Sequence, residues 1–312
     1  MSYLLSLRKF LRVHPYFATF FGGGLFVLSA IAAIVWRFSY FYSSFVIGLF
    51  LFFDAATHLL DKSISFSSNL NRIGKTFWMV LFFFIFFTDL VAGQIIFSVW
   101  QYPPYKGFIN WVLLYLIIYP VGGLSLIAMF RFFDLLFGKI FPGNFFQIKE
   151  AARFTKKTLK IILLALPVAM MIPVGLYFSR LVEIFAQNQV LYSFIFIFLF
   201  FEWTFFFDIL ILAFGGKPIL LDLIRGEKKV FLAILVSGLL GAFLHEVINT
   251  FVHEWVYVTK NFPVTPATFL GVPVVVFVAW IPLTIVCVQA YRLGTVIKEG
   301  GLLETLKKEY FT

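Results

Sequence analysis

The sequence is poor in charged residues and has almost no cysteine. Only 13% of its 312 residues are Asp, Glu, Lys or Arg, whereas a soluble domain carries about 25%. Hydrophobic residues make up 62% of the chain, and its mean hydropathy is +0.97. The one cysteine, Cys287, lies in an apolar run, so there is no disulfide framework and no Cys-x-x-Cys motif. This composition excludes a soluble globular protein and predicts a multi-pass α-helical membrane protein.

The sequence also lacks the short motifs that would name a reaction. It has no Gly-x-x-x-x-Gly-Lys-Ser/Thr phosphate loop, no clustered His boxes of a membrane desaturase and no Asp-x-x-x-Asp motif of a prenyltransferase. The zinc-protease motif His-Glu-x-x-His is missing as well, because Asn249 stands where the second His would be. Any function must therefore be inferred from the placement of single polar residues.

Long apolar runs divide the chain. A helix needs about 20 apolar residues to cross the hydrocarbon core of a bilayer. Eight segments satisfy this condition, approximately 16–36, 39–60, 77–99, 109–130, 160–180, 190–214, 230–252 and 268–290. We therefore expect an all-α polytopic protein with eight transmembrane helices.

Basic residues are distributed unevenly among the loops. If the N-terminus is inside, the two tails and the loops after the second, fourth and sixth helices hold 20 of the 25 Lys and Arg residues. The opposite loops hold only Arg37, Lys106, Arg180 and Lys260. This positive-inside pattern predicts cytoplasmic termini and a location in the cell (plasma or inner) membrane. The net charge of +10 follows from this topology, so we expect no nucleic-acid partner.

Two stretches of the chain repeat one pattern. Phe52-Phe53-Asp54 recurs as Phe206-Phe207-Asp208, and Gln94 followed by Trp100-x-Tyr102 recurs as Asn249 followed by Trp255-x-Tyr257. The amide and the Trp-x-Tyr motif are 155 residues apart in the two copies. The pattern predicts a tandem duplication, with a four-helix repeat in residues 1–150 and a second in 151–312. Because four helices are an even number, both repeats would have the same orientation. The Trp and Tyr residues are typical of an interfacial aromatic belt.

Ionisable residues concentrate in the seventh apolar segment. On an ideal helix Glu246, Asn249 and His253 lie within about 60° of one another, and His245 lies at the margin of this stripe. A carboxylate and an imidazole on one face could form an acid–base pair, a proton path or part of a metal site. The corresponding residues of the first copy are Val91, Gln94 and Ser98. The ionisable residues therefore occur in the second copy alone, which predicts one site per chain.

Other polar residues could complete this site or form another. Asp89 and Glu202 are candidates for a carboxylate across the pocket, although Asp89 points about 140° away from Gln94 on an ideal helix. Asp54 and His58, four residues apart, could fix a His tautomer or bind a metal. A divalent metal ion is thus a candidate cofactor. Its candidate ligands are His245, Glu246 and His253, with Asp54 and His58 as a second set.

The second half of the chain resembles a known family. Glu246-x-x-Asn249, Trp255-x-Tyr257 and Gly271-Val-Pro273 are similar to motifs in an uncharacterised family of prokaryotic multi-pass membrane proteins. More distantly, the Glu-x-x-Asn and Gly-Val-Pro…Trp280 elements resemble those of membrane-integral carotenoid cyclases and hydratases. That resemblance implies acid–base chemistry on a long polyene inside the bilayer.

The sequence leaves three functions open. In the first, the protein binds or transforms a lipophilic small molecule near the outer leaflet, with Glu246 as acid or base, His253 or His245 as its proton partner and Asn249 as an orienting donor. In the second, it is a non-catalytic subunit of a larger membrane complex and its charges pair across helix interfaces. In the third, it is a proton-coupled transporter. The expected partners are the lipid bilayer, a lipophilic ligand and, in the second case, other membrane subunits.

Overall fold

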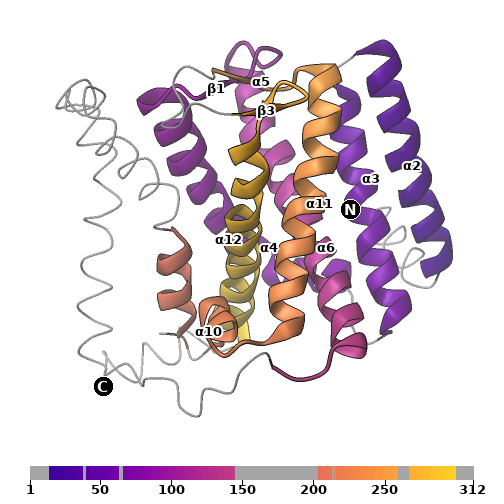
Figure 1. Ribbon diagram of the computed structural model, residues 1–312, viewed down its shortest axis with the longest axis vertical. Helices are drawn as coiled ribbons and strands as arrows, with labels where there is room; N and C mark the ends of the chain where they lie inside the picture. Colours follow the sequence, from indigo (N-terminus) through magenta and orange to yellow (C-terminus); the bar gives the residue numbers. More distant parts are fainter. Residues whose placement is uncertain are drawn as a thin grey trace.

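The protein is almost entirely helical over the residues that the structure describes. The structure is a computed structural model, and it describes residues 14–37, 40–62, 66–144, 203–212, 214, 216–258 and 267–299 (Figure 1). Five helical segments are long and apolar enough to cross a membrane, namely Pro15–Trp36, Tyr40–Leu60, Phe108–Ile140, Lys228–Val252 and Val274–Ile297. The protein is therefore a multi-pass α-helical membrane protein.

The expected segments match the structure to different degrees. Five of the eight overlap these spans, and residues 77–96 of the segment 77–99 belong to helix α4 (Phe66–Ile85) and π-helix η1 (Phe86–Ile96). The segment 160–180 lies outside the described residues, as does most of 190–214, of which Trp203–Leu212 is an apolar helix. The count of eight membrane helices and the position of the termini therefore stay predictions.

Two expected boundaries are wrong. The fourth segment continues well beyond residue 130, because α5 (Phe108–Leu113), η2 (Leu114–Ile118) and α6 (Tyr119–Ile140) follow one another without a break. The last helix, α12 (Val274–Glu299), begins later than expected. The residues before it form an antiparallel hairpin of β3 (Thr268–Phe269) and β4 (Val272–Pro273), with left-handed Leu270 and Gly271 at its turn. Hydropathy measures apolarity, so it does not separate an apolar hairpin from a helix.

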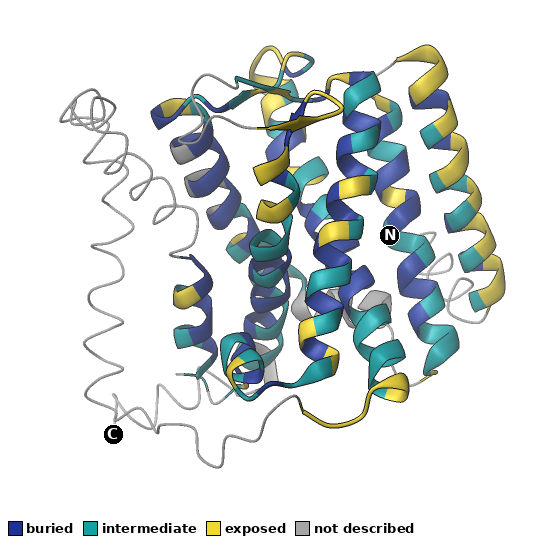
Figure 2. Cartoon of the chain, viewed as in Figure 1, coloured by how far each residue is buried: buried dark blue, intermediate teal, exposed yellow. Residues whose placement is uncertain are grey.

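The helices form a bundle, and one edge of it exposes apolar side chains. Helix α2 (Pro15–Trp36) packs along α3 (Tyr40–Leu60), α3 packs on α6, and α11 (Lys228–Val252) lies between α6 and α12 (Figure 1). Helix α2 forms the outer edge and exposes large apolar side chains along it (Figure 2), including Tyr16, Phe17, Phe20, Leu28, Ile31 and Val35. In a bilayer such a face contacts the acyl chains, which are as apolar as the side chains themselves.

Glycine brings α2 and α3 into backbone contact. A Cβ atom on Gly22 would lie 2.5 Å from the backbone nitrogen of Phe52, and one on Gly48 would lie 2.4 Å from that of Phe26. Only residues without a side chain permit this approach, which is how membrane helices commonly associate. The contact fixes α3, which carries Tyr42 toward the second half of the chain.

The two ends of the bundle differ. We call one the strand end, because β1 (Trp100–Gln101), β2 (Val256–Tyr257), β3 and β4 lie there, and the other the α10 end, after helix α10 (Ile219–Ile224) (Figure 1). Strands β1 and β2 pair antiparallel, with Trp100 opposite Tyr257 and Gln101 opposite Val256. Shortly before each strand, Ser98 and His253 have left-handed backbones with φ of 50° and 52°. The strand pair thus joins the two Trp-x-Tyr motifs at one end of the bundle.

Candidate functional site

Glu246 is held at one oxygen and unpaired at the other. It lies on α11 near the strand end and is 1% exposed. Its Oε1 accepts hydrogen bonds from the Tyr257 hydroxyl (2.7 Å) and from Nε1 of Trp280 (3.0 Å). Its Oε2 is buried and has no hydrogen-bond partner among the described residues. A carboxyl group in this arrangement has a fixed orientation and one atom available for a proton or a ligand.

His245 lies beside Glu246 and is fixed in a similar way. Its Nδ1 is 2.6 Å from the Tyr42 hydroxyl, and its ring stacks on Trp280 with centroids 4.7 Å apart. Its Nε2 is buried without a hydrogen-bond partner in the described part of the chain. Trp280 therefore contacts both residues, since its ring covers His245 and its Nε1–H reaches Glu246. Of the two histidines expected near Glu246, His245 is thus the one that shares a contact residue with it.

The expected position of His253 is wrong. Helix α11 ends at Val252, and His253 caps it with a left-handed backbone and an exposed side chain. The stripe of Glu246, Asn249 and His253 assumed that the helix continued at 100° per residue. Because the helix stops, His253 leaves that stripe.

Asn249 organises the turn that follows α11. Its Nδ2 donates to the backbone oxygen of Trp255 and its Oδ1 accepts from the backbone N–H of Trp255, both at 3.0 Å. The indole Nε1–H of Trp255 in turn donates to the Tyr257 hydroxyl at 2.7 Å. The Glu-x-x-Asn and Trp-x-Tyr motifs are therefore one hydrogen-bonded unit, in which Asn249 positions the chain that delivers Tyr257 to Glu246.

Asp89 is enclosed by donors from the first half of the chain. Its Oδ1 accepts from Trp100 (2.6 Å), Tyr102 (2.7 Å) and Tyr119 (3.0 Å), and its Oδ2 accepts from Tyr115 (2.8 Å) and Gln94 (3.0 Å). These five hydrogen bonds engage both oxygen atoms. Asp89 is thus the centre of its own cluster, and both of its oxygen atoms are already engaged within it.

The contact between Asp89 and Gln94 contradicts the expected 140° separation. Both residues belong to the π-helix η1, in which residue i bonds residue i+5 rather than i+4. The wider turn brings side chains five residues apart onto the same face. Trp100, Tyr102 and Tyr257 turn their polar atoms toward buried carboxylates, and the interfacial aromatic belt stays a prediction.

A third buried carboxylate, Glu254, was not among the expected site residues. It is 1% exposed, its Oε1 accepts a hydrogen bond from the Tyr105 hydroxyl, and its Oε2 has no partner among the described residues. Burial raises the pKa of Glu254 to about 7, although the Tyr105 hydrogen bond opposes part of this increase. Its position directly after the end of α11, within the run His253-Glu254-Trp255, was the one available sequence signal.

The remaining candidates lie on other elements or outside the described residues. Asp54 is buried on α3, and His58 is half-buried, with no hydrogen-bond partner for its Nδ1 among the described residues, so the Asp54–His58 pair stays a prediction. Asp208, the counterpart of Asp54, accepts hydrogen bonds from the backbone N–H groups of Ile219 (3.0 Å) and Leu220 (2.6 Å) at the start of α10. Glu202 lies outside the described residues.

The described part of the chain contains no assembled set of metal ligands. No group of three or more His, Cys, Asp or Glu side chains is placed there to hold a metal ion. The divalent metal stays a prediction.

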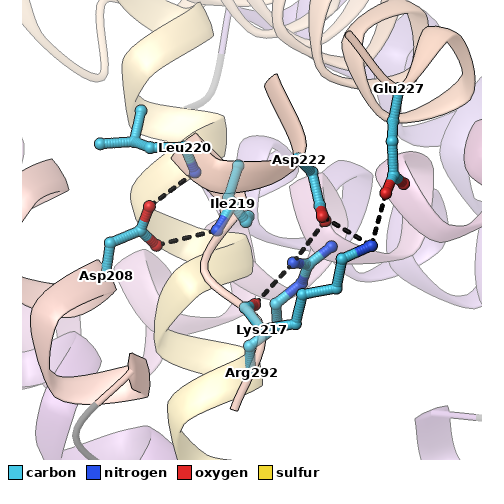
Figure 3. A network of polar contacts seen from close by, with 7 residues as sticks. All are labelled: Asp208, Lys217, Ile219, Leu220, Asp222, Glu227 and Arg292. Carbon is cyan, nitrogen blue, oxygen red and sulfur yellow. Dashed lines mark hydrogen bonds and ion pairs between the residues drawn. The ribbon is translucent and has the colours of Figure 1, made fainter. Parts of the chain in front are cut away.

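The α10 end carries a polar network of another kind (Figure 3). Asp222 is 1% exposed and forms ion pairs with Lys217 (2.7 Å) and Arg292 (2.9 Å). Lys217 also pairs with Glu227 at 2.6 Å, and Arg292 donates to the backbone oxygen of Lys217 at 2.8 Å. These contacts tie the loop before α10 to α12.

Comparison with known proteins identifies no relative. The chain matches no protein-family model, and no curated protein and no solved structure shows a significant match to it.

Proposed function

We propose that this integral membrane protein binds a lipophilic small molecule, isoprenoid-like or lipid-like, and holds or transforms it at Glu246 and His245. The observation that carries the proposal is a pair of buried atoms, Glu246 Oε2 and His245 Nε2, that have no hydrogen-bond partner among the described residues and belong to two groups that are otherwise fixed. An unpaired buried polar atom costs about 1–3 kcal/mol. A ligand that offers a hydroxyl, a carbonyl or a proton would relieve this cost.

The geometry around these atoms favours acid–base chemistry. Tyr257 and Trp280 hold Glu246 Oε1, so a proton bound by this carboxyl group would reside on Oε2. Tyr42 occupies His245 Nδ1, so Nε2 is the nitrogen that faces a ligand. A fixed carboxyl and a fixed imidazole on adjacent residues supply the acid and the base that such chemistry needs.

Access from the bilayer supports a lipophilic ligand. Trp280, which contacts both groups, is half-buried on α12. The same helix exposes Val275 (46%) and Val278 (55%), and α11 exposes Phe243 (49%). These apolar side chains would face the acyl chains in a membrane, so a ligand dissolved in the bilayer could reach Trp280 from the side.

The strand pairing supports the proposed duplication. In the β1–β2 register, Trp100 lies opposite Tyr257, and Gln101 lies opposite Val256, its own counterpart 155 residues later. Exchanging each residue for its counterpart in the other copy leaves the same pairing. A two-fold axis through the strand pair requires this property. Ser98 and His253 are also counterparts, and both are left-handed. On this basis we propose two tandem repeats of four helices, 1–150 and 151–312.

The charges at the two ends support the proposed orientation. Among the described residues, the α10 end holds Lys139, Lys217, Arg225, Lys228 and Lys229, and the strand end holds Arg37 and Lys106. The positive-inside rule places the α10 end in the cytoplasm. Glu246 and His245 would then lie near the outer leaflet of the cell membrane.

The test is ligand retention by a neutral variant. We expect purified wild-type protein to carry a lipophilic compound, detected by mass spectrometry, that Glu246→Gln loses by about tenfold or more, the effect of one hydrogen bond to a charged or protonated group. Glu227→Gln makes the same chemical change at the α10 end and should retain the compound. A Glu246→Gln protein that loses stability and keeps its ligand would show a purely structural Glu246.

The same preparation separates the competing functions. A subunit of a larger complex should co-isolate with stoichiometric partner chains and carry no lipophilic compound. A proton-coupled transporter should acidify or alkalinise the lumen of proteoliposomes when its substrate is added, and Glu246→Gln should stop this. Either result, in the absence of a retained compound, would replace the proposal made here.

A further inference from the structure

A polar cavity lies at the α10 end, separate from Glu246 and His245. Its volume is about 310 Å³, and its wall includes Asp134 of α6, Lys217, Asp222 of α10, Lys229 of α11 and Arg292 of α12. A second cavity of about 260 Å³ shares Glu227 and Lys229 with it. Pockets that bind small molecules begin at about 300 Å³. The first cavity is therefore large enough for a small polar group.

Most charges around this cavity neutralise one another. Lys217 pairs with Asp222 and Glu227, and Arg292 pairs with Asp222 (Figure 3). The contacts also make this wall rigid, because they join the loop before α10, α10 itself and α12. Three acidic and three basic residues line the cavity, so one of each sign stays outside the network. These two are Asp134 and Lys229.

Asp134 and Lys229 line the cavity, and neither has a direct partner in the part of the chain that the structure describes. Asp134 Oδ1 is buried and accepts no hydrogen bond from any described residue. Lys229 is exposed at the start of α11 and interacts electrostatically with Asp134, yet no described residue forms an ion pair or a hydrogen bond with it. Among the described residues, the cavity wall therefore presents one free acceptor and one free cation to a ligand.

The cavity also lies at the depth of lipid headgroups. Asp134 is six residues before the end of the membrane span Phe108–Ile140, which corresponds to about 9 Å along the helix axis. Lys229 is the second residue of the span Lys228–Val252. The headgroup layer adds about 5–7 Å to each side of the hydrocarbon core, so both side chains lie at or near this layer.

We propose that the cavity binds a zwitterion that places an ammonium group against Asp134 and a phosphate group against Lys229. This is the chemistry of an ethanolamine phospholipid headgroup or of its water-soluble form. An ammonium N–H satisfies the buried Oδ1 of Asp134, and Lys is a common phosphate ligand. Val230 and Val296, which also line the cavity, would contact the apolar part of the ligand. The proposal does not depend on the function of Glu246.

Binding should be measured on delipidated protein in detergent micelles with three lipids of identical acyl chains. Native mass spectrometry should show that the ethanolamine lipid binds about tenfold more tightly than the choline lipid, because a trimethylated nitrogen cannot donate a hydrogen bond to Asp134. The glycerol lipid, which has no cation, should bind as weakly as the choline lipid. Equal affinities for the three lipids would overturn the proposal.

Soluble glycerophosphoethanolamine identifies the source of the ligand. If it binds with the same preference over glycerophosphocholine, the cavity recognises the headgroup alone and accepts a free zwitterion. If only the lipid binds, the acyl chains are required and the membrane supplies the ligand. Both outcomes support the zwitterion chemistry.

Two variants test the assigned contacts. Asp134→Asn should abolish the preference for ethanolamine over choline, and Lys229→Gln should weaken both lipids by about tenfold. Lys139→Gln is the matched control, because Lys139 is exposed on α6, donates to the Leu60 backbone oxygen at 3.2 Å and does not line this cavity. Since Lys229 is exposed, its variant should fold even if Asp134→Asn does not. Unchanged binding by Lys229→Gln would overturn the proposal, whereas Glu246→Gln should keep the lipid preference.

Discussion

The two ends of the bundle neutralise buried carboxylates in different ways. At the α10 end, Asp222 lies between two cations, Lys217 and Arg292. At the strand end, Asp89, Glu246 and Glu254 accept hydrogen bonds from phenol, indole and amide groups alone. Among the described residues, no Lys or Arg pairs with any of these three. The ends therefore differ in whether the negative charge is compensated.

This difference separates a structural network from a site that can change state. An ion pair compensates both charges and holds its partners in one arrangement, so its protonation does not need to change. A buried carboxylate without a cation is costly in its charged form, and its environment favours uptake of a proton or of a cationic or hydrogen-bonding ligand. Function that involves proton exchange is therefore expected at the strand end.

Neutralising a carboxylate should reduce stability much more at the α10 end than at the strand end, and this is the largest expected effect. Asp222→Asn leaves Lys217 and Arg292 without their shared partner, and we expect a loss of about 3 kcal/mol in the free energy of unfolding. This value is at the low end for buried pairs, because Lys217 is 50% exposed and can be hydrated. Glu246→Gln keeps an acceptor for Tyr257 and Trp280 and should change stability by less than about 1 kcal/mol.

Denaturation of the purified proteins in micelles measures both values. Glu227→Gln serves as the control for removing a charge next to Lys217. Equal destabilisation by Asp222→Asn and Glu246→Gln would contradict the distinction between the ion-paired carboxylate of the α10 end and the uncompensated carboxylates of the strand end.

The pH dependence of stability should report Glu254. Its folded pKa of about 7 exceeds the ordinary value of 4.5, so the folded state binds the proton more tightly than the unfolded state. Its contribution is therefore most favourable below pH 4.5 and is lost as the pH rises toward 7. Between pH 5 and pH 7 we expect a decrease of about 2 kcal/mol in the free energy of unfolding, since each pH unit is worth up to about 1.4 kcal/mol.

Glu254→Gln isolates this contribution. The variant should have a flatter stability profile between pH 5 and pH 7 than the wild type, measured by denaturation in micelles at several pH values. Tyr105→Phe provides a second comparison, because it removes the hydrogen bond that opposes the increase in the Glu254 pKa. Identical slopes for the wild type and Glu254→Gln would show that Glu254 does not titrate in this range.

The sequence is sufficient to predict a multi-pass membrane protein and part of the candidate site. Apolar runs of about 20 residues indicate membrane helices irrespective of tertiary contacts, and five spans are confirmed. The concentration of ionisable groups in one apolar segment indicates a polar site at Glu246 and His245, because such groups are costly inside a bilayer. The structure joins them through Trp280.

The errors arise where the local backbone departs from an ideal α-helix. A regular spacing of 100° predicts His253 on the Glu246 stripe, but the helix ends at Val252. The same spacing predicts a separation of 140° between Asp89 and Gln94, but the π-helix brings them together. Neither a helix end nor a π-turn follows from counting residues. The contact of Tyr42 with His245 spans 203 positions, and spacing rules do not reach that far.

Close packing of Trp100 on Gly93 should control the Asp89 cluster. A Cβ atom on Gly93 would lie 2.2 Å from Cζ2 of Trp100, so Gly93→Ala must displace the ring that donates to Asp89. We expect a loss of about 1–2 kcal/mol in the free energy of unfolding. Gly122→Ala is the matched control, since nothing lies within 4 Å of its Cβ position. It should stabilise the protein by up to about 1 kcal/mol.

The smallest expected effect concerns the Lys217–Glu227 pair, which is the exposed part of the α10-end network. Lys217 is 50% and Glu227 17% exposed, and such pairs contribute about 0–1 kcal/mol. We therefore expect Glu227→Gln to cost about 0.5 kcal/mol at low ionic strength and less at 1 M salt, where the screening length falls to about 3 Å. Asp222→Asn should keep most of its cost at 1 M salt, because buried pairs are screened much less. Equal salt sensitivity in the two variants would mean that water reaches Asp222, and the compensated end would then resemble an ordinary surface.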